Sequence, residues 1–238
     1  MINDNKNIHI IHWHTPKYNQ RSLASKRYHQ SKKSTLIRNM VRQQVAHRLD
    51  RPDSHVIYQT NPQGKPSFII HGNNGHAITP CPIHFSISHS HDISVFVLHD
   101  RAIGIDIEYP KTLTLSRRVS LMKRCLQAIH PHKTVHELLI QYQALPPHQQ
   151  HDILWKHWTY LEAFTKLKGQ TLWQTFKQQA PKTWDDSLTI HDIYYSQPYE
   201  YQTWFSTLQS NHTLCLVSHE PNHSSTQLGQ IIHNIQVD

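Results

Sequence analysis

The sequence contains few cysteines, and their spacing excludes two familiar cysteine-based scaffolds. The chain has three, Cys81, Cys125 and Cys215, which lie far apart and form no CxxC pair. An odd number of distant cysteines indicates neither a disulfide framework nor a thiolate zinc site. We therefore expect a protein of the reducing cytoplasm.

Long apolar runs are also lacking. A membrane-spanning helix needs about 20 apolar residues, and no segment approaches that length. The first residues, Met1 to Lys6, are polar and unlike a signal peptide. We expect a soluble protein without a membrane partner, and its 238 residues suffice for one large domain or two small ones.

Acidic residues are scarce relative to basic ones. The chain has 16 Asp and Glu against 24 Lys and Arg, a net charge of +8 that favours acidic partners. It also has 23 histidines, some of them grouped, as at His9, His12 and His14. The histidines are spread among many glutamines, and no group has a matching second ligand pair. We interpret them as surface composition rather than as a metal site.

Apolar periodicity and turn residues predict alternating helices and strands. The predicted helices span residues 31–49, 116–145 and 152–168. The predicted strands span residues 85–88, 93–98, 103–108, 187–195, 201–207 and 213–219. Turn and breaker residues indicate a turn at Gly64-Lys65-Pro66, a loop over 72–82, a break at Pro146-Pro147 and a helix end at Gly169. This repeated order of helix then strands predicts an α+β fold with two similar halves joined near residues 104–110.

The strand predicted over residues 103–108 carries two carboxylates on one face. Side chains two apart in a strand point the same way, so Gly104, Asp106 and Glu108 lie opposite the alternating isoleucines. The two acidic residues would be roughly 7 Å apart at their Cα atoms, within reach of one Mg²⁺. The alternative is an ordinary half-buried strand whose outer face is acidic by chance.

The helix predicted over residues 152–168 adds a third carboxylate and a cation. Trp158, Glu162 and Lys166 follow one another at intervals of four and share one stripe of the helix. The alternative is a surface Glu–Lys pair worth only about 0.3–0.5 kcal/mol.

Groups suited to phosphate precede both segments. Residues 85–90, Phe-Ser-Ile-Ser-His-Ser, read as a strand that runs into a turn with hydroxyls, backbone N–H groups and an imidazole. Lys65 adds a cation fixed by its turn. A solvated hairpin turn is the alternative for residues 85–90. Taken with the carboxylates, these groups predict phosphoryl-type chemistry on a metal.

In order, these segments resemble the motifs of the 4'-phosphopantetheinyl transferases, specifically the larger monomeric type that includes the surfactin- and enterobactin-activating enzymes. The matching segments are Gly64-Lys65-Pro66, residues 85–90 for FxxSHS, 104–108 for GxDxE and 158–166 for WxxKEAxxK. The resemblance implies two α+β subdomains, residues 1–103 and 104–238. Each would be a small, mainly antiparallel sheet packed on helices, and an approximate twofold axis would relate them.

The resemblance also implies a reaction. The phosphopantetheine arm of coenzyme A would pass to a serine of an acidic apo acyl or peptidyl carrier protein, and adenosine 3',5'-bisphosphate would be released. Mg²⁺, or Mn²⁺ in its place, would be bound by Asp106, Glu108 and Glu162. Glu162 would also take the proton of the serine, directly or through water.

The remaining motif residues are implied to bind coenzyme A. Lys166 would contact its pyrophosphate, and Lys65, Ser88 and His89 its nucleotide end. No motif assigns a partner to the 3'-phosphate. Basic residues ahead of or within the first helix are available for it: Lys26, Arg27, Lys32, Lys33, Arg38 and Arg42.

Two positions depart from the family pattern. Leu161 stands where the family usually has the lysine of KEA, and Thr171 replaces the second glycine of a GxG. If that lysine assists proton transfer, its loss costs roughly 10²- to 10⁴-fold in rate. A second hypothesis is therefore a weakly active or non-catalytic paralogue that binds coenzyme A and carrier proteins.

A third hypothesis is a basic nucleic-acid-binding protein. Its signature would be aromatic residues interleaved with a dense Lys/Arg stripe, and the sequence has no such stripe. We therefore expect a monomer whose partners are coenzyme A and a carrier protein, and no nucleic acid.

Overall fold

The first half of the fold is a four-stranded sheet with one long helix against it. The strand order is β11 (Ile231–Val237), β1 (Asn7–Trp13), β6 (Ile93–His99) and β5 (His84–Ser90). The helix α1 (Leu23–Arg48) packs its apolar side onto this sheet through Ile37, Val41 and Val45. A small antiparallel sheet of β2 (Val56–Thr60), β3 (Pro66–His71) and β4 (Ile78–Pro80) follows the short 3-10 turn Asp53–His55.

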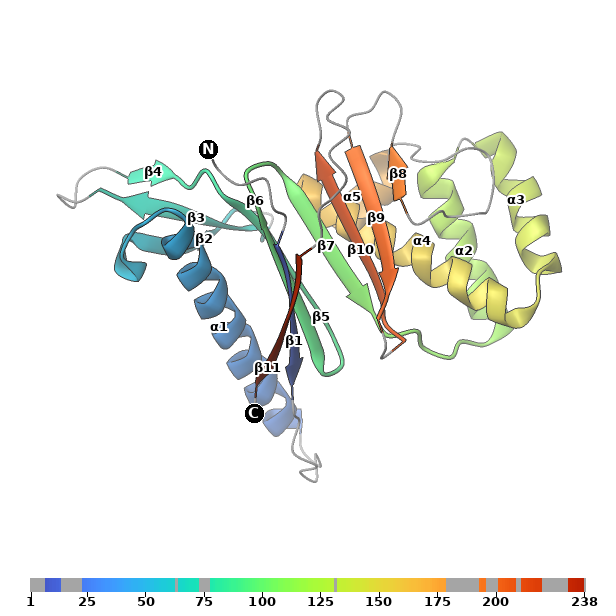
Figure 1. The fold of residues 1–238 in the computed structure, drawn as a ribbon. Helices are drawn as coiled ribbons and strands as arrows, with labels where there is room; N and C mark the ends of the chain where they lie inside the picture. The colour runs from blue at the N-terminus through green and yellow to red at the C-terminus, as the bar shows by residue number, and fades with distance from the viewer. Residues whose placement is uncertain are drawn as a thin grey trace.

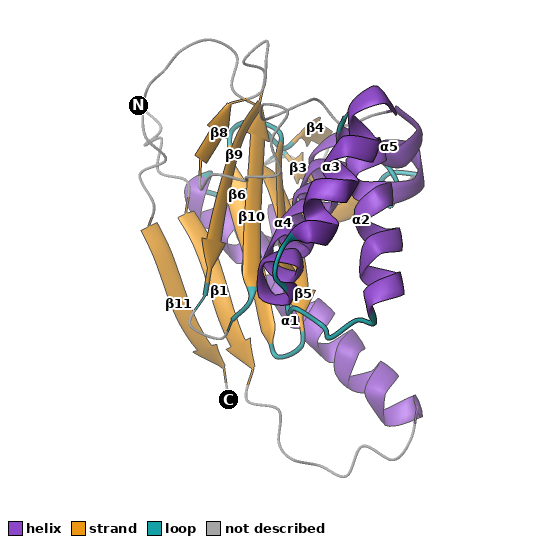
Figure 2. Ribbon diagram, turned by 90° about the vertical axis from the view of Figure 1, so that its right-hand side faces the viewer, coloured by secondary structure: helices purple, strands orange, loops and turns teal. Residues whose placement is uncertain are grey.

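The second half is another four-stranded sheet, covered by a cluster of helices. Its strand order is β7 (Ile103–Glu108), β10 (Thr213–His219), β9 (Tyr201–Thr207) and β8 (Ile193–Tyr195). The helices are α2 (Leu115–Ile129), α3 (His132–Ala144), α4 (Pro147–Lys168) and α5 (Leu172–Gln178). Figure 2 shows α2 to α5 gathered on one side of the strands.

The two halves lie side by side, with α1 at one end and α2 to α5 at the other (Figure 1). This computed structural model describes residues 7–13, 23–62, 64–72, 78–130, 132–178, 193–195, 201–208, 211–219 and 231–237. Over these residues the protein mixes helices with small, mainly antiparallel sheets, so the predicted α+β class is confirmed.

One strand pair in the first sheet is parallel. Residues 231–237 of β11 run alongside residues 7–13 of β1, whereas the neighbouring strand pairs are antiparallel. The segment 104–238 therefore contributes strands to both large sheets. The boundary expected at residues 103 and 104 falls at the start of β7, but β11, which follows it in the sequence, belongs to the first sheet.

Strand β7 is buried on both faces, and each face packs against a different layer. Ile103, Ile105 and Ile107 join an apolar cluster formed with residues of β6, β9 and β10. Gly104 and Asp106 lie on the opposite face, against which α4 packs. The predicted alternation along this strand is confirmed.

Gly104 is required by the close approach of α4 to β7. A Cβ atom at this position would lie 1.9 Å from the Ala163 carbonyl oxygen and 2.7 Å from the Leu167 nitrogen. Both are backbone atoms of the helix, so no side-chain rotation could relieve the clash. The missing side chain lets the helix press directly onto the strand.

We expect Gly104→Ala to lower the free energy of unfolding by about 3 kcal/mol or more, because α4 would have to move off the sheet. Gly64→Ala is the matched control. Its Cβ would meet nothing within 4 Å, and its cost comes from a φ of +85° alone, about 1–2 kcal/mol. Urea denaturation measures both, and equal losses would contradict this account of Gly104.

The helices differ from the prediction at their ends. α1 begins earlier than residue 31, and the helix predicted over 116–145 is two helices, α2 and α3, separated at His130. α4 starts at Pro147 rather than at 152, because proline is tolerated in a first helical turn, where its missing N–H is not needed. Gly169 ends α4 with a left-handed φ of 65°, as predicted.

The hairpin predicted around residues 89–92 is confirmed, but its strands are longer. β5 continues to Ser90 and pairs there with Ile93, so the connection is His91-Asp92 alone. Strands over 103–108, 201–207 and 213–219 are confirmed. Of the predicted strand 187–195, residues 187–192 lie outside the described part and 193–195 form β8. The pattern missed β1, β2, β3, β4 and β11.

The histidines are not all surface residues, so that interpretation was wrong in part. His9, His99, His130, His157 and His212 are buried. A buried imidazole is stable when it is neutral and hydrogen-bonded. His157 shows both properties: its Nδ1 lies 2.8 Å from the Ile153 carbonyl and so must carry the proton, and burial lowers its pKa to about 3.

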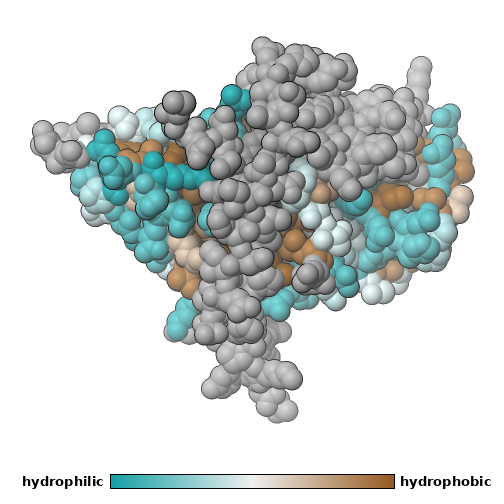
Figure 3. Space-filling view, viewed as in Figure 1, coloured by the Kyte–Doolittle hydropathy of each residue, from teal (hydrophilic) through white to brown (hydrophobic). Residues whose placement is uncertain are grey.

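None of the helices among the described residues combines the length and the apolarity needed to cross a bilayer. On the face seen in Figure 3, hydrophilic residues cover much of the part around α1, and apolar residues appear in smaller patches.

Candidate functional site

Three serines of β5 join the two large sheets. Ser86, Ser88 and Ser90 alternate along the strand and are buried. Their hydroxyl oxygens accept hydrogen bonds from the backbone N–H groups of β7 and the residue after it: Ile105 at 3.0 Å, Ile107 at 3.4 Å and Tyr109 at 2.9 Å. In the described strands β5 and β7 belong to different sheets, so these hydroxyls form a serine seam between them.

Ser88 is the centre of a small charged network on this seam. Its hydroxyl donates to Asp106 Oδ1 at 2.8 Å and accepts from Lys166 Nζ at 2.8 Å. With the bond from Ile107, the single donor and both lone pairs of the hydroxyl are used. Lys166 Nζ also lies 2.7 Å from Asp106 Oδ1. A residue from each of β5, β7 and α4 thus meets at one point.

Asp106 has one carboxylate oxygen that this network does not use. The residue is buried, and its Oδ2 atom accepts no hydrogen bond from any described residue. A buried carboxylate oxygen without a partner is costly, and proteins normally supply a donor or a cation. Asp106 can therefore take one more positive ligand.

Glu108 lies two residues further along the same strand and is tied to the seam as well. The Ser90 hydroxyl donates to Glu108 Oε2 at 3.3 Å, and the side chain of Trp158 on α4 donates a second hydrogen bond. Burial raises the pKa of Glu108, and the charge of Asp106 acts in the same direction. Lys111 and the two hydrogen bonds oppose that rise.

Glu162 brings the third carboxylate to this cluster from α4. Burial raises its pKa to about 7, and the negative charges of Asp106 and Glu108 add to the effect, while Lys166 opposes it. The charge of Asp106 raises the pKa of both Glu108 and Glu162, so the site has an excess of negative charge. Near neutral pH, Glu162 can either hold or release a proton.

The cluster is suited to a divalent cation, although its side chains do not surround a closed position. Among the described residues, no three His, Cys, Asp or Glu side chains are grouped tightly enough to count as a ready metal site. The ammonium of Lys166 lies against Asp106 instead. The unpartnered Oδ2 of Asp106 and the raised pKa of Glu162 nevertheless fit oxygen ligands for Mg²⁺.

An open cleft of about 260 Å³ lies at the C-terminal end of α4. It is lined by the turn before β3, the first part of β5 and the end of α4: Gly64, Lys65, Ser86, Ile87, Lys166 and Gly169. Two lysines thus contribute to a cleft whose described lining includes no acidic residue. An anionic ligand here would be close to the carboxylate cluster, because Lys166 belongs to both.

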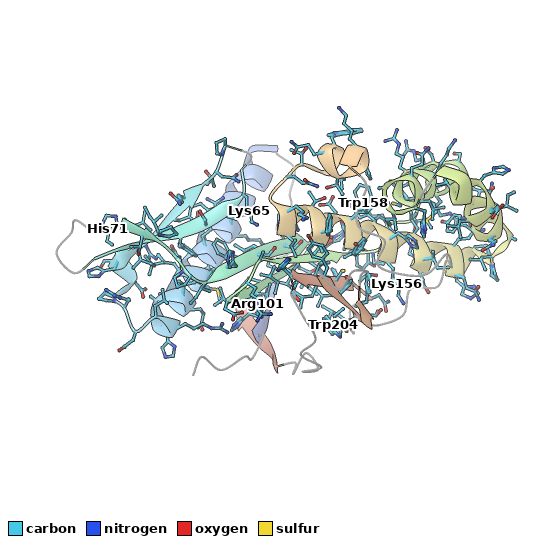
Figure 4. The ribbon with its side chains drawn as sticks, turned by 90° about the horizontal axis from the view of Figure 1, so that it is seen from above. Lys65, His71, Arg101, Lys156, Trp158 and Trp204 are labelled. Carbon is cyan, nitrogen blue, oxygen red and sulfur yellow. The ribbon has the colours of Figure 1, made fainter. Side chains whose placement is uncertain are left out.

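Lys65 is held in place by α4. Its Nζ donates to the Leu167 carbonyl at 2.7 Å, and its aliphatic stem passes so close to Gly169 that a Cβ there would be 2.4 Å away. Figure 4 shows Lys65 beside this end of α4, with Trp158 further along the helix. Burial lowers the pKa of Lys65. The lysine therefore caps the helix and lines the cleft at the same time.

His89 lies on the other side of β5 from the serine seam. Partial burial lowers its pKa, the charges of Lys166 and Lys33 lower it further, and Asp106 opposes them. These influences place His89 near the cations of both α1 and α4. It therefore belongs to the surroundings of the cleft rather than to the carboxylate cluster.

The structure brings most of the predicted site residues together. Asp106, Glu108, Glu162, Lys166 and Ser88 form one cluster, whereas Lys65 and His89 lie around it. Ser88 was expected in a turn open to phosphate, but β5 extends past it, and the hydroxyl is buried and committed within the protein.

Sequence reasoning missed two contributors, Ser90 and the Trp158 side chain, both of which donate to Glu108. The alternation of serines at 86, 88 and 90 was the available signal for the first. A strand with small hydroxyls on one edge can satisfy a neighbouring backbone.

Leu161 is fully buried in the apolar cluster formed by α2, α4 and the second sheet. It precedes Glu162 in the sequence, but its side chain is part of the core. An ammonium at this position would have to be buried among apolar side chains.

No known family model matches the chain, and no curated protein is significantly similar to it. The function must therefore be argued from the arrangement of the side chains.

We expect Ser86→Ala to cost about 1–3 kcal/mol of stability, because it leaves the Ile105 N–H without its acceptor. Ser88→Ala should cost more, since it removes the acceptor of Ile107 and also separates Asp106 from a donor. Urea denaturation measures the free energy of unfolding of both variants, which change equivalent positions of one strand. Equal losses would show that the bonds of Ser88 to Asp106 and Lys166 add no stability to that of the backbone hydrogen bond.

Proposed function

We propose that this chain is a 4'-phosphopantetheinyl transferase. It transfers the 4'-phosphopantetheine group of coenzyme A to a serine of an apo carrier protein, in a Mg²⁺-dependent reaction that releases adenosine 3',5'-bisphosphate. The observation that carries the proposal is the meeting of Asp106, Glu108, Glu162 and Lys166 beside a cleft lined with lysine.

The position of these residues supports the proposal because they come from segments far apart in the chain. The family motifs in β5, β7 and α4 converge at the serine seam, and the GKP turn contributes to the same cleft through Lys65. Incidental surface carboxylates would have no reason to share one buried cluster. An acidic strand face formed by chance is thus the weaker explanation.

In this proposal Asp106, Glu108 and Glu162 bind Mg²⁺, or Mn²⁺ in its place. The ion would neutralise the charge that develops on the pyrophosphate. Glu162 takes the proton of the attacking serine, directly or through water. Lys166 leaves Asp106 and meets the pyrophosphate with its ammonium.

The cleft at the C-terminal end of α4 is the proposed site of coenzyme A. Lys65 and Lys166 supply positive charge from two sides. Lys33 is close enough to His89 for its charge to lower the pKa of the imidazole. Ser88, which the resemblance assigns to the nucleotide end, would act on coenzyme A only indirectly, by positioning Lys166 at the pyrophosphate. The net charge of +8 suits an acidic carrier protein in the cytoplasm, because opposite charges speed encounter.

The proposed architecture is a pair of α+β halves related by an approximate twofold axis, in a monomer. Two features support it. Each half has a four-stranded sheet with a long helix packed on it, and the two sheets meet at β5 and β7. Under this arrangement the active site lies between the halves.

Glu162→Gln should abolish transfer, with a loss of at least about 10²-fold, because it removes the base and a metal ligand while keeping the shape. The assay is intact-mass spectrometry of an apo carrier protein incubated with coenzyme A and Mg²⁺, with an EDTA control. Glu137→Gln, at an exposed position of α3, is the matched variant and should transfer normally. Full activity in Glu162→Gln would refute the proposed role.

The same assay, combined with measurements of coenzyme A and DNA binding, separates the two other hypotheses. If the native protein binds coenzyme A but no carrier gains mass, the chain is the non-catalytic paralogue that the replacement of the motif lysine by Leu161 suggests. In that case Leu161→Lys would raise transfer only if the protein still folded with an ammonium in its core. Salt-sensitive binding to random duplex DNA without coenzyme A affinity would favour the nucleic-acid alternative.

Lys166→Met should bind Mn²⁺ more tightly than the native protein, although transfer falls. The ammonium 2.7 Å from Asp106 competes with a metal for the same carboxylate. Lys168→Met, at an exposed position two residues further on, removes the same charge and serves as the control. Titration followed by electron paramagnetic resonance gives the affinities. Unchanged Mn²⁺ affinity in Lys166→Met would exclude this competition.

A further inference from the structure

A second cleft, also of about 260 Å³, lies between α1 and β2. Its polar lining comes from one face of the helix and from the segment that enters β2: Thr35, Arg38, Asn39, Arg42, Ser54 and Tyr58. The four helix residues recur at intervals of three and four, the spacing of one helix face. Figure 1 shows α1 beneath the small sheet that contains β2.

The cleft is positively charged and lacks a counter-charge. It has two arginines, and none of the described residues that line it is acidic. The Nε atom of Arg42 is buried and donates to no acceptor in the described part of the chain. A buried guanidinium donor without a partner beside an open cleft indicates a ligand with acceptor oxygens.

The second arginine is held in position before any ligand arrives. The guanidinium of Arg38 lies over the ring of Tyr58, 4.9 Å from its centre. Such a contact limits the rotamers of a long side chain, so less entropy is lost on binding. The aromatic face is already covered, so the cleft offers charge and hydrogen bonds rather than a surface on which a base could stack.

The α1–β2 cleft is separate from the cleft at the end of α4. The two clefts share no lining residue. Lys33 lies near His89, because its charge lowers the pKa of that histidine. Arg42 follows Lys33 by nine residues, which at roughly 100° per residue places it on the opposite side of the helix. An anion beside Arg42 therefore does not occupy the coenzyme A cleft.

We propose that the α1–β2 cleft binds a phosphate group, either as inorganic phosphate or as the terminal group of a small phosphate ester. Two guanidinium forks match the oxygens of one tetrahedral dianion. The Ser54 hydroxyl and the Asn39 amide add neutral donors from the two sides of the cleft. A bound phosphate links α1 to β2 and stabilises the native protein by mass action.

The test is a phosphate titration of the whole protein, followed through the arginine Nε–H signals in ¹H–¹⁵N NMR spectra. Sodium chloride keeps the ionic strength constant, and the missing signal in Arg42→Lys assigns Arg42. We expect its Nε–H signal to shift and to saturate, in the native protein and equally in Lys166→Met. A shift no larger than that caused by chloride alone would overturn the proposal.

Two variants locate the site. Arg42→Ala should weaken phosphate binding about tenfold or more, because a charge-assisted donor is lost. Asn39→Asp keeps both arginines and places a carboxylate in the cleft, so it should weaken binding similarly even if Arg42→Ala does not fold. Arg117→Ala, at an exposed position of α2, is the control. Native affinity in Asn39→Asp would refute the site.

Glycerol 3-phosphate identifies the source of the phosphate. If it binds at least tenfold more tightly than inorganic phosphate, the cleft recognises the ester. If the two bind equally, the ligand is free phosphate.

Discussion

The serine seam is the interaction on which the rest of the site depends. Three hydroxyls of β5 accept hydrogen bonds from alternate N–H groups of β7 and its extension. This fixes the register between two sheets that share no ladder among the described strands. Register matters because a slip of one residue would turn Asp106 and Glu108 to the face occupied by the isoleucines. The seam therefore decides which side chains meet α4.

The second constraint is the absence of a side chain at Gly104. The serines position the strand laterally, and Gly104 sets how near the helix comes to it. Glu162 and Lys166 lie on the stripe of α4 that approaches β7, so this short distance puts a carboxylate and an ammonium beside Asp106. The charged cluster is thus assembled by backbone packing.

Local patterns predicted the parts of the site that lie within one element. The two-residue period placed Asp106 and Glu108 together, and the helical period placed Glu162 with Lys166. What the pattern could not supply was the meeting of the elements. The role of Ser88 depends on the neighbouring strand β7, and nothing in the sequence of β5 identifies that neighbour. The Ser88 hydroxyl was therefore predicted to bind a ligand.

The same reasoning explains the errors in the fold. β1 and β11 pair across almost the whole chain, so neither has a local partner that would mark it as a strand. Pro146-Pro147 does separate α3 from α4, as predicted, but the start of α4 was placed at residue 152, although proline is compatible with a first helical turn. Histidine-rich composition suggested a solvated surface, but neutral imidazoles such as His157 pack inside.

The pairing of β1 with β11 also affects how fast the protein folds. Asn7 is opposite Ile231, so the ribosome must add all the residues between them before β1 can pair with its parallel neighbour. Contacts between residues so distant in sequence slow folding, since a large loop must close before they form. Until then, the edge of β1 that pairs with β11 has unsatisfied backbone hydrogen-bonding groups, which can pair with non-native strands. The sheet beside the seam is therefore completed last.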